Sequence, residues 1–297
     1  MTYADGSPYG QKIKLLLTAA DVNFQKCDQP RILPRPDLAA LGITYRRIPL
    51  LAVGKDVYAD TSIIIDVIMT SLAKNGALAT SPADKAFEVL GNTIFREVLG
   101  LLDPDVLPKE FIQDRKTIFP VIARPDFKTM RPSTIAQIQS RCKQIEDTFF
   151  TSSSGPFPSG DKLSLSDIHI LWSLRWGLTT LGAGKEPGCG KDAFPKIWKA
   201  IESLPEPKPE ILSSEKTIEM IKQSGYSAEG PTSVEKDDPL GFKEGTVLSV
   251  ESADAVPGAH TQVGKLVGTN IDEVVLEVGN DGVRLHMPRI GYIFRAQ

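Results

Sequence analysis

The sequence predicts an α/β domain over residues 1–78, an all-helical domain over residues 83–225 and a small, mostly β module over residues 236–297. Three observations lead to this expectation. Strand and helix patterns alternate in the first part, helical periodicity fills the middle, and apolar residues alternate with a period of two near the end. A chain of 297 residues is long enough for about two domains with substantial cores.

In the first domain, residues 9–20 have the periodicity of a helix with one buried face. A short extended piece at residues 24–28 follows, and then a stretch interrupted by prolines. Residues 50–58 have the pattern of a β-hairpin around a Gly-Lys-Asp turn. Asp60 or Thr61 is expected to cap the next helix. The buried stripe of that helix is expected to contain Ile64, Val67, Ile68 and Leu72.

The middle of the chain is predicted to be entirely helical. Helical patterns cover residues 83–103, 133–150, 164–182 and 192–203. Ser164 and Asp167 have the spacing of a capping box at the start of the third of these helices. Trp172 and Trp176 are expected in the core, because helices with this spacing bury their aromatic residues.

The end of the chain changes from a linker to a β pattern. Prolines and charged residues cluster between residues 203 and 239, which predicts a linker with one short helix at residues 214–223. Strands are then expected at residues 246–250, 263–267, 274–278 and 283–287. The turn residues Asn280-Asp281-Gly282 separate the last two strands, as in a hairpin.

The composition is that of an ordinary globular protein, with 41% hydrophobic and 24% charged residues. A formal net charge of −3 argues against a sequence-independent nucleic-acid binder, which needs a basic excess. No apolar run approaches the roughly 18 residues of a membrane span, and no N-terminal signal pattern is present. We therefore expect a cytoplasmic protein without nucleic-acid or membrane partners.

Cysteine and histidine patterns predict neither a disulfide framework nor a metal site. The three cysteines lie far apart and form no CxxC pair. The three histidines are equally scattered. These residues are Cys27, Cys142, Cys189, His169, His260 and His286.

Three short motifs contain the candidate functional residues. They are Ser7-Pro8-Tyr9-Gly10, Ile48-Pro49 and Asp60-Thr61-Ser62. Taken singly, each has a purely structural explanation. Ser7 and Asp60 fit helix caps, and Pro49 fits the start of a strand. Their order and spacing along one α/β unit carry more information than any one of them.

Because it combines these motifs with an α/β unit followed by a helical unit, the chain resembles the cytosolic glutathione transferase family over about residues 1–225. The resemblance implies a thioredoxin-like N-terminal domain and an all-α glutathione transferase C-terminal domain. The phrase RIPLLAVGKDVYADTSIIID is similar to fungal members. The module at 236–297 is not part of the usual architecture, and its role is unknown. Only six residues precede Ser7, so the first strand of the domain is expected to be shortened or missing.

The resemblance implies that glutathione is the co-substrate and that Ser7 stabilises its thiolate, with Tyr9 as the second choice. The thiolate is the nucleophilic form of a thiol. The resemblance also implies a cis peptide bond between Ile48 and Pro49. The backbone of Ile48 would then form two strand-like hydrogen bonds with the cysteinyl unit of glutathione.

The resemblance assigns the γ-glutamyl group to Asp60 and Thr61 at a helix N-terminus, with Ser62 as the next hydroxyl. Free N–H groups at a helix N-terminus bind carboxylates, and the Asp60 carboxylate can balance the ligand's amino group. Arg47 lies where relatives often carry a lysine that reaches the glycyl carboxylate. Arg46 could serve instead, and a solvated surface role for either arginine remains open.

The second substrate is expected to be a small electrophile near Phe95, Arg96 and Leu99 of the first helix of the helical domain. The predicted reaction is conjugation, or a glutathione-assisted isomerisation or elimination, in a homodimer without a metal. The alternative is a non-catalytic binding or regulatory protein of the same fold. A thiol oxidoreductase is disfavoured, because Ser7 and Gly10 stand where such an enzyme has its cysteines.

Overall fold

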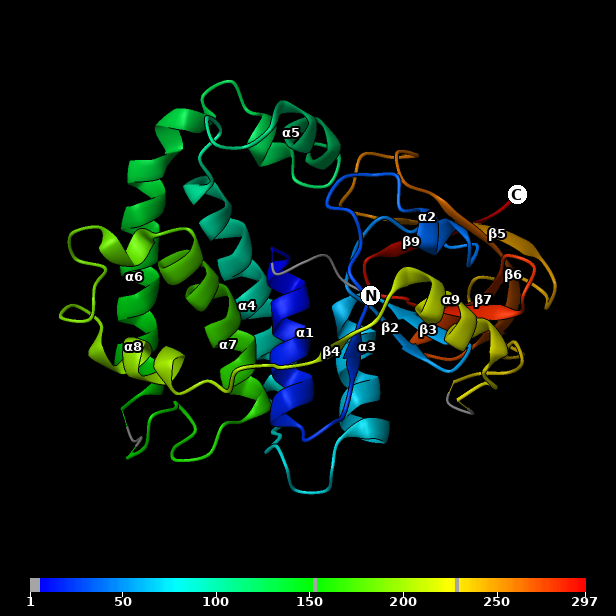
Figure 1. Cartoon of the computed structure of the whole chain (residues 1–297), viewed down its shortest axis with the longest axis horizontal. Coiled ribbons are helices and arrows are strands. Elements are labelled where there is room, and N and C mark those ends of the chain that lie inside the picture. Colours follow the sequence, from blue (N-terminus) through cyan, green and yellow to red (C-terminus); the bar gives the residue numbers. More distant parts are fainter. Residues whose placement is uncertain (1–5, 152–153, 228–229) are drawn as a thin grey trace. The chain divides into compact units, whose positions relative to one another are not determined.

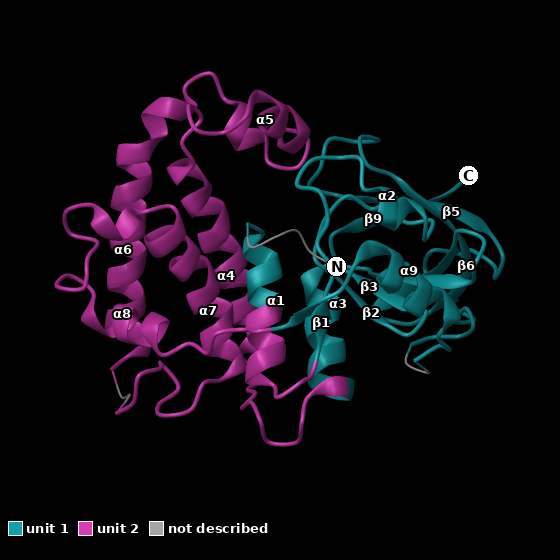
Figure 2. Cartoon of the chain, in the orientation of Figure 1, with its two compact units in different colours: residues 1–13, 24–71, 209–297 teal, residues 14–23, 72–208 magenta. Residues whose placement is uncertain are grey.

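The computed structural model describes residues 6–151, 154–227 and 230–297. The chain forms two compact units, and each is considered by itself (Figure 2). Unit 1 comprises residues 1–13, 24–71 and 209–297, and unit 2 comprises residues 14–23 and 72–208.

The N-terminal part of unit 1 has the predicted helices and hairpin (Figure 1). Its elements are the start of α1 (Pro8–Ala19), β1 (Gln25–Lys26), α2 (Pro36–Ala39), β2 (Leu50–Val53), β3 (Asp56–Ala59) and α3 (Thr61–Val67), which continues as a π-helical turn, η1 (Ile68–Leu72). The expected first strand falls on residues 1–5 and so lies outside the described residues. The helix expected after Asp60 is confirmed.

The C-terminal part of unit 1 continues the sheet that the hairpin begins. Its elements are β4 (Glu210–Ile211), α9 (Ser214–Gln223), β5 (Val247–Ser252), β6 (Gln262–Thr269), β7 (Glu273–Val278), β8 (Val283–Pro288) and β9 (Tyr292–Ala296). Seven strands form one sheet in the order β2-β3-β8-β7-β6-β5-β9, and β4 pairs separately with β1. In Figure 1 the orange and red strands lie beside the blue hairpin strands.

The junction between the hairpin and the C-terminal strands is the pairing of β3 with β8. This pair is parallel, whereas every other pair in the seven-stranded sheet is antiparallel. Tyr58 lies opposite His286 in the β3–β8 register. Strand β9, which the sequence did not predict, closes the far end of the sheet against β5.

A hydrophobic cluster joins the N-terminal and C-terminal parts of unit 1. Buried residues from the N-terminal part pack with buried residues of the C-terminal strands in a single core. Its fully buried members include Ala59, Leu248, Val274, Leu276, Val283, Leu285 and Met287. The boundaries 1–78, 83–225 and 236–297 remain a prediction about independent domains. The shared core shows that the C-terminal strands and the β2–β3 hairpin are packed as one unit.

Unit 2 is helical. It contains α4 (Asp84–Val98), α5 (Lys109–Arg115), α6 (Arg131–Phe149), α7 (Leu165–Arg175), α8 (Pro195–Glu202) and the shorter turns η2 (Leu99–Leu101), η3 (Pro120–Ala123), η4 (Phe127–Met130), η5 (Trp176–Thr180) and η6 (Ala183–Lys185). The capping box of Ser164 and Asp167 is confirmed at the start of α7. Helices α4 and α7 pack closely at Gly91, where a Cβ atom would lie 1.8 Å from the carbonyl oxygen of His169.

Candidate functional site

Ser7 caps helix α1. Its Oγ accepts a hydrogen bond of 3.0 Å from the backbone N–H of Gly10, and the residue is 3% exposed. Within the described ranges, the hydroxyl hydrogen of Ser7 has no acceptor. The interpretation of Ser7 as a helix cap is therefore confirmed, and the same geometry allows its hydroxyl to donate to a ligand. Tyr9 is half-buried in the first turn of the same helix.

The peptide bond between Ile48 and Pro49 is cis, as the resemblance implied. Pro49 is buried and leads into β2, whereas Ile48 is half-buried. Among the residues that the structure describes, the N–H and C=O groups of Ile48 take part in no hydrogen bond. Both groups can therefore pair with an extended backbone of another molecule.

Asp60 is the N-cap of helix α3. Its Oδ1 accepts hydrogen bonds from the backbone N–H of Ser62 at 3.0 Å and from the Ser62 hydroxyl at 3.1 Å. Its φ angle is +81°, a conformation that costs a non-glycine residue about 1–3 kcal/mol. The two hydrogen bonds offset part of this cost. Thr61 follows as a buried residue at the helix start.

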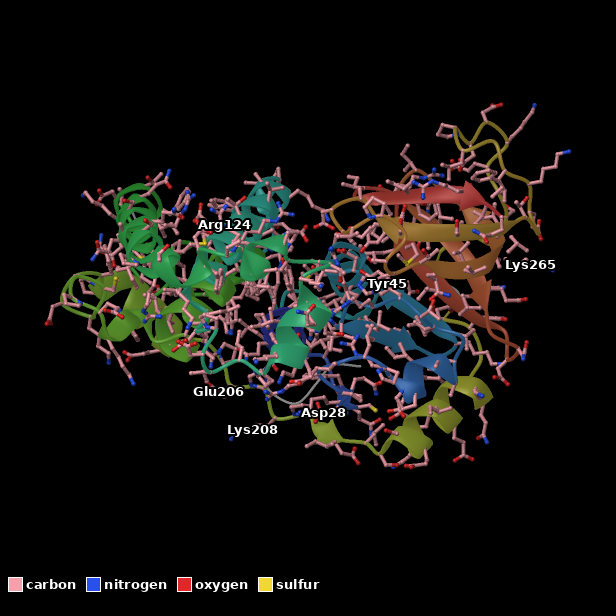
Figure 3. All side chains as sticks on the ribbon, turned by 90° about the horizontal axis from the view of Figure 1, so that it is seen from above. Asp28, Tyr45, Arg124, Glu206, Lys208 and Lys265 are labelled. Carbon is pink, nitrogen blue, oxygen red and sulfur yellow. The ribbon has the colours of Figure 1, made fainter. Side chains whose placement is uncertain are left out.

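The C-terminal strands supply a second partner for Asp60. The hydroxyl of Tyr292, in β9, donates to Asp60 Oδ2 at 2.8 Å. The Tyr292 oxygen lies 2.5 Å from the Tyr45 oxygen. Because Tyr292 directs its one hydrogen to the carboxylate, Tyr45 must be the donor in the second bond. Figure 3 labels Tyr45, which precedes strand β2.

The two phenols remain protonated over the physiological range. Burial and the nearby Asp60 carboxylate raise the pKa of Tyr45 well above its ordinary value. Burial also raises the pKa of Tyr292, as do its neighbours Tyr45 and Asp60. Tyr292 therefore acts on Asp60 as a neutral hydrogen-bond donor and not as a base, and Tyr45 donates in turn to Tyr292.

Arg47 is also bound by the C-terminal strands. Its Nη2 donates to Oδ1 of Asp254, in the β5–β6 connection, at 2.5 Å. Burial by itself lowers the pKa of Arg47, but Tyr45, Tyr292 and Asp254 outweigh it and raise the pKa above its ordinary value. Arg46, the alternative cation, is only 2% exposed. Arg47 is thus the more accessible of the two arginines.

Gln262 fixes the backbone between α2 and these arginines. Its Oε1 accepts from the N–H groups of Thr44 at 2.7 Å and Tyr45 at 3.0 Å, and its Nε2 donates to the carbonyl of Gly42 at 3.1 Å. Gln262 is 1% exposed at the start of β6. The segment that leads to Ile48 is therefore held in place by the C-terminal strands.

Sequence reasoning missed Tyr45, Tyr292, Asp254 and Gln262. The run Tyr292-Ile293-Phe294 is rich in β-forming residues and could have predicted β9. No local signal could have paired Tyr292 with Asp60, because 232 positions separate them in the chain. Only the folded sheet brings them together.

The second-substrate candidates lie on α4 and η2 in unit 2. Phe95 is 2% exposed and stacks with Trp172 and Trp176, with ring centroids 5.5 and 5.4 Å away. Leu99 is buried, and Arg96 is exposed. The expectation that Trp172 and Trp176 belong to the core is confirmed.

The cysteines are buried free thiols in this structure. Burial raises the pKa of Cys142 to about 12, which keeps that thiol protonated at neutral pH. In the described ranges, no group of three or more His, Cys, Asp or Glu side chains is arranged to hold a metal ion. No helix in those ranges has the length and apolar character needed to cross a membrane.

Comparison with protein families finds two matches. Residues 1–74 match the model described as "Glutathione S-transferase, N-terminal domain". Residues 102–206 match a "Domain of unknown function (DUF7962)". Comparison with curated proteins finds no match.

Solved structures give further matches. A GST-like protein from Pseudomonas syringae has 22% sequence identity and a TM-score of 0.68, and the match covers 100% of this chain and 98% of that chain. A glutathione transferase homologue from Sulfitobacter with bound glutathione has 15% identity, a TM-score of 0.47, and coverage of 68% and 89%. A glutathione S-transferase from Actinobacillus pleuropneumoniae has 16% identity, a TM-score of 0.46, and coverage of 76% and 93%. The last two similarities are too low to support an argument about this chain.

Residues 1–74 match a glutathione S-transferase N-terminal domain. The chain has a glutathione S-transferase-like fold with a helical middle region. Because the match to the Pseudomonas syringae protein covers the whole chain, the likeness of fold includes the C-terminal strands.

Proposed function

We propose that this protein binds glutathione in unit 1 and uses it as the thiol substrate of a glutathione S-transferase-like reaction. The observation that carries the proposal is the hydroxyl of Ser7. Its oxygen already accepts from Gly10 N–H at the start of α1, so its hydrogen is available for donation to a ligand. A thiolate placed there receives this hydrogen bond at the positive end of a helix.

The energies needed for thiolate formation match what this position can supply. A free thiol with a pKa near 8.5 must shift by about two units to be largely ionised at neutral pH, which corresponds to about 2.7 kcal/mol. A hydrogen bond to a charged group contributes about 1.5–3 kcal/mol. The helix N-terminus adds about 0.3–1 kcal/mol. Ser7 and α1 together therefore contribute about 1.8–4 kcal/mol, a range that includes the shift required. Tyr9 is the second candidate donor.

The rest of the tripeptide is assigned to the other two motifs. The N–H and C=O of Ile48, before Pro49, pair with the cysteinyl backbone. Three hydrogen bonds use three of the roughly four acceptor positions of the Asp60 carboxylate. The remaining position accepts from the γ-glutamyl ammonium. The α-carboxylate of the same group lies at the N-terminus of α3, near Thr61 and Ser62.

The reaction follows from the nucleophile. The thiolate sulfur donates an electron pair to an electrophilic carbon of a small molecule, in conjugation or as a step of an isomerisation or elimination. Of the three second-substrate candidates, Arg96 is exposed and remains a proposed contact, whereas Phe95 and Leu99 are buried. A cytoplasmic homodimer is proposed from the family resemblance, and light scattering tests the dimer.

One observation favours a second candidate function, a non-catalytic binding protein of the same fold. Arg47, the residue proposed for the glycyl carboxylate, is already paired with Asp254. A protein whose ligand-binding residues are already paired with its own side chains can retain the fold without catalysing a reaction. Binding and thiolate formation must therefore be measured separately.

Calorimetric titration with glutathione, together with ultraviolet absorbance of the thiolate near neutral pH, tests both candidates. The wild type is expected to bind at millimolar ligand or below and to show the thiolate band. Ser7→Ala is expected to lose the band. Ser213→Ala is the matched control, because Ser213 caps α9 by the same kind of bond to Lys216 N–H. Both variants lose about 1 kcal/mol of stability as cap deletions, but the control keeps the thiolate.

Three outcomes decide the matter. Absence of glutathione binding rules out the proposed function. Binding without thiolate formation in the wild type supports the non-catalytic alternative. An undiminished thiolate band in Ser7→Ala shows that another group, such as Tyr9, stabilises the sulfur.

A further inference from the structure

The C-terminal part of unit 1 contacts both ends of the proposed glutathione site, but with groups of different charge. At one end, Tyr292 donates to Asp60 and leaves the carboxylate its negative charge. At the other end, Asp254 places a carboxylate against Arg47 and cancels its positive charge. The first contact preserves the charge that a ligand ammonium requires. The second offsets the positive charge with which a ligand carboxylate would pair.

Asp254 Oδ1 accepts a second hydrogen bond beside the one from Arg47. Oδ1 of Asp254 accepts from Arg47 Nη2 at 2.5 Å and from the hydroxyl of Ser252 at 2.5 Å. The Arg47 side chain is 25% exposed and that of Asp254 is 46% exposed. A ligand carboxylate that approaches Arg47 therefore meets a carboxylate already in place, and like charges repel.

The neighbouring cation does not replace Arg47. Arg46 is 2% exposed, and its carbonyl accepts a hydrogen bond from Arg35 at the base of the same segment. Its guanidinium is thus enclosed in the protein. The segment that leads to Ile48 presents one accessible guanidinium, and Asp254 is paired with it.

We propose that Asp254 determines ligand specificity by neutralising Arg47, so that the site accepts γ-glutamyl thiols whether or not they carry a free glycyl carboxylate. The inference rests on the proposed function, since it assumes that the γ-glutamyl end binds at Asp60 and the cysteinyl unit at Ile48. The ligand class is γ-glutamylcysteine and its C-terminally extended, esterified or amidated derivatives, including glutathione. Recognition then depends on the γ-glutamyl ammonium and on the backbone of Ile48.

The wild-type protein tests this with four thiols in calorimetric titrations. These are glutathione, its glycyl ethyl ester, γ-glutamylcysteine and cysteinylglycine. The first three are expected to bind with dissociation constants within about threefold of one another. Cysteinylglycine, which lacks the γ-glutamyl group, is expected to bind at least tenfold more weakly, a difference of about 1.4 kcal/mol.

Asp254→Asn tests the residue itself. The amide keeps the size of the side chain and removes its charge, so Arg47 becomes available to a ligand carboxylate. We expect the ratio of ester to glutathione dissociation constants to rise at least tenfold. Asp272→Asn is the matched control, because it removes an exposed carboxylate from another turn of the C-terminal strands. The control is expected to keep the wild-type ratio.

The outcomes separate this inference from the proposed function. If no γ-glutamyl thiol binds the wild type, the proposed function fails. If glutathione binds but its ester binds more than tenfold more weakly, the function stands and the inference is wrong. An unchanged ratio of ester to glutathione dissociation constants in Asp254→Asn also overturns the inference, because Arg47 would then take no part in binding the glycyl carboxylate.

Discussion

At the scale of one residue, the hydroxyl of Tyr292 connects two segments of the proposed site. It donates to Asp60 Oδ2 and accepts from Tyr45, so one phenol joins the cap of α3 to the segment before β2. Asp60 is held in a conformation that non-glycine residues rarely adopt, with a φ of +81°. Its carboxylate is therefore positioned by Tyr292 and Ser62 together.

The first prediction concerns Tyr292→Phe. The substitution keeps the ring and removes a hydrogen bond to a charged group, so we expect the free energy of unfolding to fall by about 1.5–3 kcal/mol. Affinity for every γ-glutamyl thiol is expected to weaken together, because the orientation of Asp60 is lost. Urea unfolding and calorimetric titration measure the two effects.

Tyr226→Phe is the control for this prediction. The Tyr226 hydroxyl donates to the neutral carbonyl of Gly282 at 2.9 Å in the same unit. Its loss is expected to cost about 0.5–1.5 kcal/mol and to leave thiol affinity unchanged. If Tyr292→Phe is no more destabilising than Tyr226→Phe and binds thiols equally well, Asp60 does not depend on Tyr292.

At the scale of the elements, the turn after α2 packs directly on the β7–β8 turn. Gly42 has a φ of +76°, and a Cβ atom there would lie 2.2 Å from the backbone nitrogen of Gly279. Gly279 also has a positive φ. Two glycine backbones therefore touch where any side chain would separate the N-terminal segment from the C-terminal strands.

Gly42→Ala is the second prediction. Gly258→Ala is its control, since Gly258 has a similar φ of +73° but nothing within 4 Å of an added Cβ. The control is expected to cost about 1–2 kcal/mol from the left-handed conformation alone. Gly42→Ala is expected to cost about 1–3 kcal/mol more, because the turns must move apart. Equal losses in urea unfolding would show that the close approach contributes nothing.

At the scale of the whole molecule, a buried charge cluster joins the hairpin to the C-terminal strands. His286 in β8 is 1% exposed, with Nε2 3.0 Å from Asp56 Oδ1 and Nδ1 2.9 Å from Glu273 Oε2. Each ring nitrogen faces a carboxylate oxygen, so the doubly protonated imidazolium satisfies both. Burial opposes that charge, but the hydrogen bonds to Asp56 and Glu273 outweigh it and raise the pKa of His286.

The pH dependence of stability is the third prediction. Because the pKa of His286 is higher in the folded than in the unfolded protein, its contribution is fully present below about pH 6.5, the ordinary value. The contribution is lost as the pH rises through the folded-state pKa, with a slope of at most about 1.4 kcal/mol per pH unit for one proton. The wild type is therefore expected to lose stability from near-neutral to alkaline pH in urea unfolding.

His286→Gln is expected to remove this slope, and His260→Gln, in the β5–β6 connection, is expected to keep it. Asp56 has the opposite pH dependence, and its effect on stability is seen at acid pH. Burial opposes the charge on Asp56, but the bonds from His286 and Ser227 lower its pKa below 3.8. Its contribution is present above about pH 3.8 and is lost on further acidification. A wild-type profile without an alkaline slope contradicts the assignment of a charged His286.

The sequence determined the elements whose signals are local. Apolar periodicity located α1 and α6, the spacing of Ser164 and Asp167 located the start of α7, and turn residues located the β2–β3 hairpin. The fold class followed from the order of these signals and is confirmed. The candidate motifs at Ser7, Ile48 and Asp60 were found because each involves only a few consecutive residues.

Only the tertiary structure decided what surrounds those motifs. The sequence predicted the C-terminal β strands, and only the structure shows that β8 pairs in parallel with β3 and that these strands share a core with the hairpin. Tyr292 reaches Asp60, and Asp254 reaches Arg47, across more than 200 positions of sequence. Hydrogen bonds and charge pairs of this kind depend on which distant strands share a sheet. Sheet order carries no local sequence signal, because any strand with the right alternation of apolar residues can occupy several positions.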